Sequence, residues 1–443
     1  MREGQATVSR AGIEENGFCT VAARTGNHRE EEERTGAART GAAAKNIPSV
    51  AARKKPKTPL RKPKKPLLKS LQIIAEKVQS GCKKADFSLK LLLCGLSLFG
   101  LVAVYAASSY TARKTYGDAF YFVKKQAFGV AIGWVLLAFF SRVDYRKLQK
   151  FAYPLVAVTY ILLALVFVPG ISKESYGAKR WIGLFGVTVQ PSELAKFAFV
   201  LFFATYAAKN PGRIGTFRGI LPPLFVCAGY LLLILLEPNL SVTICFAAVC
   251  FLLLFAGGAK KRHLGLLILP AAAAVPVLIA AEPYRLKRLA AFLDPWAAPK
   301  GEGYQLLQSL YAVGSGGWFG VGLFCSRQKY KFLSFAESDF ILAVIAEELG
   351  FFGVLLLFSA LAAVVFLGFR AAKKSPDFVG YLLAFGVTAV FFVQCAVNAL
   401  VVTGTIPPTG IPLPFISSGN TALAAFFAAF GVLCNVTRQG DKY

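Results

Sequence analysis

The sequence predicts an all-α integral membrane protein, a polytopic helical bundle with about ten transmembrane helices and one long extracytoplasmic loop. Of its 443 residues, 56% are hydrophobic and only 16% are charged, whereas soluble domains carry about 25% charged residues. Much of the surface must therefore face lipid. Apolar stretches long enough to cross about 30 Å of hydrocarbon also follow one another from residue 87 onward.

Polar interruptions mark off the predicted spans. We place them near 87–110, 121–140, 151–169, 189–208, 219–236, 238–257, 264–281, 340–368, 378–402 and 417–436. Thirteen basic residues lie between Arg53 and Lys90, and such a charged flank of a first span is retained in the cytoplasm. An even number of spans then places both termini there, including the C-terminal residues 438–443.

The segment 1–86 is expected to be a disordered, basic cytoplasmic tail, because it holds 19 basic and 9 acidic residues and little apolar periodicity. Nucleic-acid binding is the alternative interpretation of these charges. They lack the aromatic neighbours that stack on bases, and a basic flank is the usual topogenic and anionic-lipid signal. We therefore predict no nucleic-acid partner.

Cysteine and histidine usage excludes several kinds of site. The nine cysteines show no metal-type spacing, and the two histidines, His28 and His263, are far apart in the sequence. Haem, structural zinc and Ser-His-Asp chemistry are therefore not predicted.

The predicted topology puts three segments on the outer face: 170–188, 282–339 and 403–416. A connection as long as 282–339 is usually functional or disordered. This one is rich in aromatic residues and glycines, so we expect it to pack back on the bundle as the long extracytoplasmic loop.

In the first outer segment, Lys179 and Arg180 stand next to Trp181. Two cations beside a tryptophan at the interface suit the anionic headgroup of a lipid-linked substrate. Ordinary anchoring at the interface explains the same residues equally well.

Glu193 and Lys196 lie three residues apart at the start of the fourth predicted span, and thus on one helix face. Ionisable residues at membrane depth are costly and usually face a polar interior. The pair is a candidate functional site, and the alternative is an ion pair that only fixes helix packing.

Asp339 lies where the long loop meets the eighth span. Partial desolvation there would raise its proton affinity and suit it to act as a general base. Capping of the following helix by Ser338 or Asp339 is the alternative role.

Taken in order, these motifs resemble the SEDS family (shape, elongation, division and sporulation) of peptidoglycan glycosyltransferases, most of all its FtsW and SpoVE branch. The resemblance covers about residues 87–437. It rests on runs at 178–182, 190–196, 292–296, 303–305, 314–317, 326–329, 338–340, 347–350 and 409–417.

The resemblance implies that the chain polymerises lipid II at the outer face of the bacterial cytoplasmic membrane, in cell division or sporulation. The family's catalytic aspartate aligns with Asp339, and an inverting transfer needs only one base. The departing pyrophosphate would be neutralised by cations and by a divalent ion, Mg²⁺ or Mn²⁺, whose ligands the sequence does not identify. The expected substrate-binding residues are Lys179, Arg180, Trp181, Glu193, Lys196, Arg285, Arg327 and Ser417.

The resemblance also implies partners. It implies that peptide cross-linking is done by a class B penicillin-binding protein, along with other cell-wall or divisome proteins. The Ser-x-x-Lys sequence at Ser326–Lys329 lies in one of the runs on which the resemblance rests. Two alternatives to the polymerase remain, a lipid II flippase and a non-catalytic scaffold for a transpeptidase.

Overall fold

The computed structural model describes residues 65–440 except 176–177, 185–186, 302 and 331, and it describes no side chains at 65–85, 173–179 and 184–187. The predicted tail therefore lies outside the described residues up to position 64, and the C-terminus does so from position 441.

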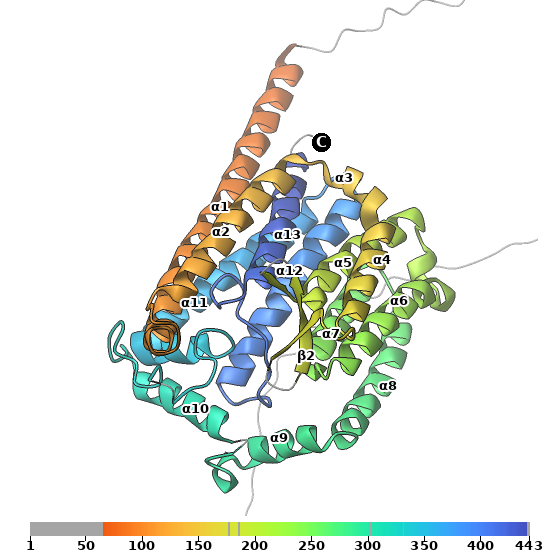
Figure 1. The fold of residues 1–443 in the computed structure, drawn as a ribbon. Coiled ribbons are helices and arrows are strands. Elements are labelled where there is room, and N and C mark those ends of the chain that lie inside the picture. The colour runs from red at the N-terminus through yellow and green to blue at the C-terminus, as the bar shows by residue number, and fades with distance from the viewer. Residues whose placement is uncertain (1–64, 176–177, 185–186, 302, 331, 441–443) are drawn as a thin grey trace, which may run out of the picture. The chain divides into compact units, whose positions relative to one another are not determined.

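The described chain is a bundle of helices with one small sheet (Figure 1). The helices are α1 (Lys65–Tyr116), α2 (Tyr121–Arg142), α3 (Tyr145–Leu148), α4 (Ala152–Leu165), α5 (Pro191–Lys209), α6 (Phe217–Leu236), α7 (Leu240–Ala256), α8 (Lys261–Ala280), α9 (Pro283–Leu293), α10 (Tyr304–Gly316), α11 (Ile341–Lys373), α12 (Phe378–Val402) and α13 (Asn420–Gln439), with short 3₁₀ turns at Gln149–Phe151, Arg213–Gly215 and Pro295–Ala297. The sheet consists of β1 (Ser172–Ser175), β2 (Ala178–Leu184) and β3 (Val187–Val189).

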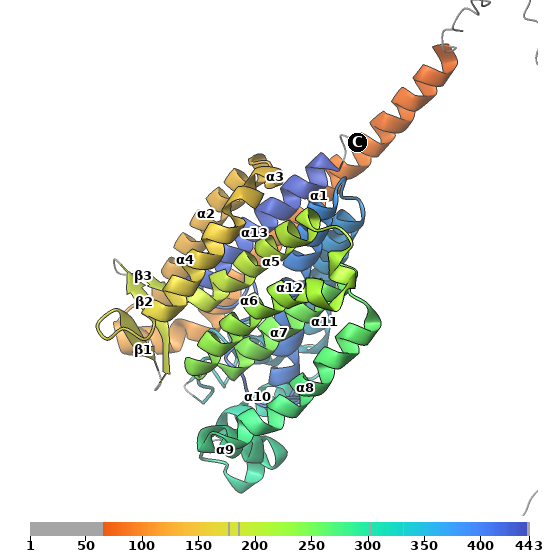
Figure 2. The ribbon, with the colours of Figure 1, turned by 90° about the vertical axis from the view of Figure 1, so that its right-hand side faces the viewer.

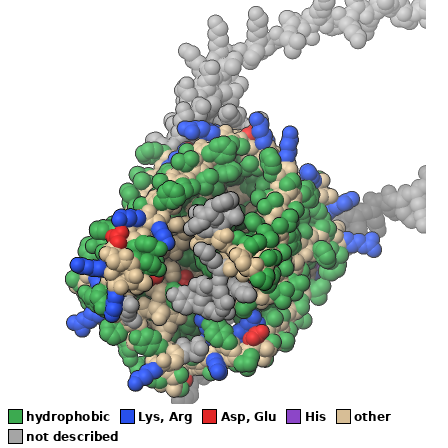
Figure 3. Space-filling view, in the orientation of Figure 1, with side chains coloured by type: hydrophobic (Ala, Val, Ile, Leu, Met, Phe, Trp, Pro, Cys, Tyr) green, Lys and Arg blue, Asp and Glu red, His purple; other side chains and the backbone are tan. Residues whose placement is uncertain are grey.

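The predicted all-α membrane fold is confirmed. Within the described chain, 8 helical stretches are long and apolar enough to cross a membrane. The two remaining predicted spans correspond to α5, which carries Glu193 and Lys196, and to α7, a shorter apolar helix. Hydrophobic side chains cover much of the face seen in Figure 3, as expected of a surface in contact with lipid.

The first helix begins earlier than predicted. α1 starts at Lys65, so residues 65–86 are helical where we expected a disordered tail. Pro66 in the first turn suits a helix start. Leu67, Leu71, Ile74 and Val78 then recur at helical spacing, a pattern that the dense lysines obscure.

The bundle is organised around α12. Two thirds of the apolar stretch of α12 is buried (67%), against 6% in α8, and Figures 1 and 2 show α8 and α9 at the rim. Phe391 of α12 contacts Phe415, Phe426 and Phe430, which form an aromatic core with it.

The segment 170–188, predicted to lie on the outer face, folds with Val189 into the antiparallel sheet β1–β2–β3, which we did not predict. Lys173 pairs with Trp181, and Ile182 pairs with Val189. The sheet fixes the direction of β2, the strand that carries Arg180.

The long loop 282–339 packs back on the bundle as predicted, although it contains two helices, α9 and α10. The buried Ser309 of α10 donates a hydrogen bond to the Val402 carbonyl of α12 at 2.9 Å. Gly316 approaches the backbone of α11 so closely that a Cβ there would lie 2.0 Å from the Ala346 carbonyl oxygen.

A break in α11 anchors the middle of this loop. Gly350 has φ 66° and ψ −166°, a conformation that favours glycine. The carbonyls of Glu347 and Glu348 accept hydrogen bonds from the loop amides of Val321 and Gly322 at 2.9 and 3.1 Å. The loop thereby satisfies backbone groups that the broken helix leaves free.

Candidate active site

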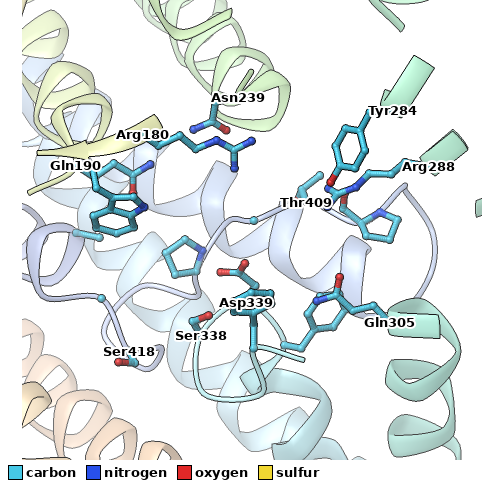
Figure 4. Close-up of a pocket in the computed structure, with 18 residues that line it drawn as sticks. Arg180, Gln190, Asn239, Tyr284, Arg288, Gln305, Ser338, Asp339, Thr409 and Ser418 are labelled. Atoms are coloured by element: carbon cyan, nitrogen blue, oxygen red, sulfur yellow. The ribbon is translucent and has the colours of Figure 1, made fainter. Parts of the chain in front are cut away.

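A polar cavity of about 230 Å³ opens where β2, the α6–α7 turn, α9, α10 and two loops meet (Figure 4). Its polar lining residues are Arg180, Trp181, Gln190, Asn239, Tyr284, Arg288, Gln305, Ser338, Asp339, Thr409 and Ser418. They come from segments that are far apart in the sequence, so only the folded bundle creates the site.

Asp339 supplies the carboxylate of this cavity. The pKa of Asp339 is raised to about 7, mainly by burial and in part by the nearby Glu337, while the Ser338 hydrogen bond and the cations Arg180 and Arg288 act in the opposite direction. A carboxylate with a pKa near neutrality can accept and release a proton at physiological pH. The predicted capping role is not seen, since α11 begins after Phe340 without a side-chain cap.

The backbone around Asp339 leaves its carboxylate room. A Cβ at Gly410 would lie 3.2 Å from Asp339 Oδ2, so any larger residue at position 410 would crowd the carboxylate. Phe335, at the start of the same turn, has φ 58°, a strained value for an aromatic residue.

Two arginines face Asp339 across the cavity (Figure 4). Arg180 donates from Nη2 to the Pro238 carbonyl at 2.6 Å and from Nε to the Glu237 carbonyl at 3.3 Å. Arg288 donates to the Pro408 carbonyl at 3.3 Å and lies over the Tyr284 ring, 4.6 Å from its centroid. Two guanidinium groups held by backbone carbonyls form a site that suits phosphate oxygens.

A second cavity of about 340 Å³ adjoins the first and shares Arg180, Arg288 and Thr409 with it. The rest of its lining is largely apolar and includes Ile244, Val275, Ile279, Leu289 and Ile406. A polar cavity that continues into an apolar one suits a ligand with an anionic head and a hydrocarbon tail.

Four of the predicted site residues belong to these cavities. Asp339, Arg180 and Trp181 line the first cavity. Arg285 lines the second and donates to the Leu278 carbonyl at 2.7 Å. Lys179 lies in β2, but its side chain is outside the described residues.

The structure places the other predicted site residues away from both linings. Arg327 is exposed, and its backbone N–H donates to Glu347 Oε1 at 3.0 Å. Ser417 is buried beneath the loop of Asp339, where its hydroxyl donates to the Ser338 carbonyl at 2.6 Å. The Ser417 hydroxyl is engaged with the protein itself, and the predicted substrate contact stays a prediction at both positions.

Glu193 and Lys196 form a buried ion pair of 2.8 Å in α5, each with about 1% of its surface exposed. Gln394 of α12 lies 3.5 Å from both carboxylate oxygens of Glu193. Neither charge lines the two cavities described above. The packing interpretation of this pair agrees with its surroundings, and the predicted substrate contact stays a prediction.

The sequence interpretation missed Arg288, Tyr284 and Gln305. Tyr284 and Arg288 are four residues apart and share a face of α9. That spacing was visible in the sequence. The prediction of a long loop at 282–339 did not include a helix there, so the two side chains were not expected to lie together.

A dedicated metal site is not formed by the protein side chains that the structure describes. Within that part of the chain, no group of three or more His, Cys, Asp or Glu residues gathers. The divalent cation therefore stays a prediction.

Comparisons with known proteins agree with this architecture. Residues 87–442 match the family model for FtsW, RodA and SpoVE, described as cell cycle proteins. The chain is 38% identical to stage V sporulation protein E of Bacillus subtilis over 362 residues, which cover 80% of this chain and 98% of that protein. It is 39% identical to a probable peptidoglycan glycosyltransferase FtsW of Geobacter sp. strain M18, over 78% of this chain and 94% of that protein.

Two kinds of solved structure are also similar. One belongs to a study of structural coordination of polymerization and crosslinking by a peptidoglycan synthase complex; the match has a TM-score of 0.67 at 28% identity and covers 80% of this chain and 97% of that one. The rod shape determining protein RodA of Thermus thermophilus matches with a TM-score of 0.59 at 26% identity, over 79% and 96% of the two chains. The family match over most of the length, together with these identities, shows that the chain belongs to the FtsW, RodA and SpoVE family of cell cycle proteins.

Proposed function

We propose that this protein is a peptidoglycan glycosyltransferase that polymerises lipid II, with Asp339 as its general base. The observation that carries the proposal is the placement of one carboxylate, with a pKa of about 7, across a cavity from two arginines. The relatives named as probable peptidoglycan glycosyltransferases support it.

The proposed reaction is a single inverting displacement. A sugar hydroxyl of the acceptor attacks the anomeric carbon of the donor, and Asp339 removes the hydroxyl proton as the new C–O bond forms. The bond to the pyrophosphate oxygen breaks, and the electron pair leaves with the pyrophosphate. One base suffices because no covalent glycosyl-enzyme is formed.

The arginines would act on the leaving group. Arg180 and Arg288 can place guanidinium donors against the pyrophosphate, whose charge grows as the bond breaks. The apolar cavity beside them would hold the first part of the polyprenyl chain.

A divalent cation would add further charge neutralisation. Mg²⁺ is usually held by one or two carboxylates together with substrate phosphates. Asp339 is the carboxylate among the residues that line the polar cavity, and the proposal reserves it as the base, so such an ion would be held mainly by the phosphates of the substrate.

The proposed location is the bacterial cytoplasmic membrane, with the cavity at the outer face and both termini in the cytoplasm. The basic residues before the first span support this orientation.

The proposed partner is a class B penicillin-binding protein. A membrane helix of that partner could pack against exposed apolar side chains of α11 such as Phe351, Leu355 and Leu356.

Incubation of the purified full-length protein with lipid II tests the function. We expect glycan strands to appear with this chain alone or with its transpeptidase partner added. Movement of lipid II across vesicles without polymer would identify a flippase. Polymer made only by an added, unrelated polymerase would identify a scaffold, and either result would reject the proposal.

A further inference from the structure

Three consecutive backbone carbonyls of the Asp339 loop are each bound by a different donor from the C-terminal part of the chain. The Ser418 amide donates to the Glu337 carbonyl at 2.9 Å. The Ser417 hydroxyl donates to the Ser338 carbonyl at 2.6 Å, and Asn398 Nδ2 donates to the Asp339 carbonyl at 2.8 Å. We call these three donors the carbonyl clamp.

The clamp is built on rigid, buried groups. Asn398 lies in α12, which is largely buried in the bundle, and 1% of its surface is exposed; for Ser417 the value is 4%. The Ser417 hydroxyl accepts the Leu413 amide at 2.8 Å, and the Ser417 carbonyl accepts Gln126 Nε2 of α2 at 3.1 Å. Ser417 is therefore held in place by contacts outside the Asp339 loop.

Asn398 also fixes the opposite side of the carboxylate. Its Nδ2 donates a second hydrogen bond to the Ile411 carbonyl at 2.8 Å. Ile411 follows Gly410, the residue next to Asp339 Oδ2. The Asn398 side chain thus joins the backbone of Asp339 to the backbone of Ile411, and so sets the distance between the Asp339 carboxylate and Gly410.

The loop needs such support because it is strained. Phe335 has φ 58°, and the amides of Ser338 and Phe340 both donate to its carbonyl. A residue held in that region persists only when its surroundings constrain it. Without the clamp, the turn could relax and carry Asp339 with it.

We propose that Asn398 and Ser417 are positioning residues that, with the Ser418 amide, fix the Asp339 carboxylate in the reactive geometry. The inference rests on the proposed role of Asp339 as the base. It concerns neutral side chains that do not line the cavity, so it adds to the site residues described above.

The test replaces each of the two side-chain donors by a side chain of similar size that cannot donate a hydrogen bond, in the variants Ser417→Ala and Asn398→Leu. The matched control is Ser309→Ala, which removes another buried serine hydroxyl bonded to a carbonyl of α12, that of Val402. All variants are compared as folded, full-length protein with lipid II as substrate.

We expect kcat to fall about ten- to a hundredfold in the clamp variants with little change in KM, because small displacements of a catalytic group have such effects. A displaced Asp339 that becomes less buried should also move the midpoint of the pH–rate profile down from about 7, because weaker desolvation favours the charged form. The charged and titratable groups that face Asp339, namely Glu337, Arg180, Arg288 and Tyr284, are unchanged in these variants. A purely structural role would lower the amount of folded enzyme and leave the midpoint in place.

Amide hydrogen exchange of residues 335–340 gives a readout that does not depend on catalysis. We expect faster exchange in both clamp variants than in Ser309→Ala. Exchange, kcat and midpoint that all match the control would overturn the inference while leaving the polymerase intact. If Asp339→Asn proves fully active, the proposed base is wrong, and exchange alone then decides whether the clamp holds the loop.

Discussion

Replacement of Asp339 by asparagine is expected to lower the rate of lipid II polymerisation by about a hundred- to ten-thousandfold, the usual cost of losing a general base. Asparagine keeps the size of the side chain but cannot accept the proton. The hydrogen bond from Asn398 Nδ2 goes to the backbone carbonyl of residue 339, so it does not depend on which side chain residue 339 carries. Expression and thermal stability should therefore stay near those of the wild type.

Asp118→Asn is a suitable control for this experiment. Asp118 is another carboxylate, on the loop before α2, where it pairs with Lys124 at 2.8 Å. Its substitution should leave polymerisation unchanged. Retention of more than about a tenth of the activity by Asp339→Asn would be incompatible with general-base catalysis of the usual magnitude.

Neutralisation of one partner of the Glu193–Lys196 pair is expected to destabilise the protein by roughly 3–5 kcal/mol, because it leaves the other charge buried and unpaired. Both side chains are almost fully buried, and their charged atoms are 2.8 Å apart. Glu193→Gln and Lys196→Met should each lower the thermal unfolding temperature strongly in detergent. The double variant should lose less than the sum of the two single losses.

Exchange of the two charges, Glu193→Lys with Lys196→Glu, should likewise cost less than either single neutralisation. A double-mutant cycle measures this coupling directly. Additive losses would show that the two charges are stabilised independently, by groups such as Gln394, and the pairing would then lack energetic significance.

The membrane fold could be predicted from the sequence because length and hydropathy alone identify a span. The sheet at 172–189 could not be predicted in this way. Its three strands are short, and they are held together by antiparallel pairing with one another, which the hydropathy of each segment does not show. The start of α1 was missed because lysines interrupt the apolar pattern of residues 65–86.

Site residues could be predicted where a charged side chain stands at the edge of an apolar span. Asp339 and Arg180 are charges at a membrane boundary, and both line the cavity. Ser417 illustrates the limit: its partner is a backbone carbonyl 79 positions away in the sequence, and no residue type marks such a contact. Its presence in a family motif suggested substrate binding, and the fold places it under the loop of Asp339.

The pH dependence of lipid II polymerisation by the wild-type protein tests the central claim, that a carboxylate with a raised pKa acts as the base, most directly. Asp339 accepts a proton only when it is ionised, and its pKa is about 7. The rate should therefore be low in acid, rise as the pH passes through about 7 and level off above it. A rate that is the same on both sides of this value, or that falls as the pH rises through it, would contradict the assignment of Asp339 as the general base.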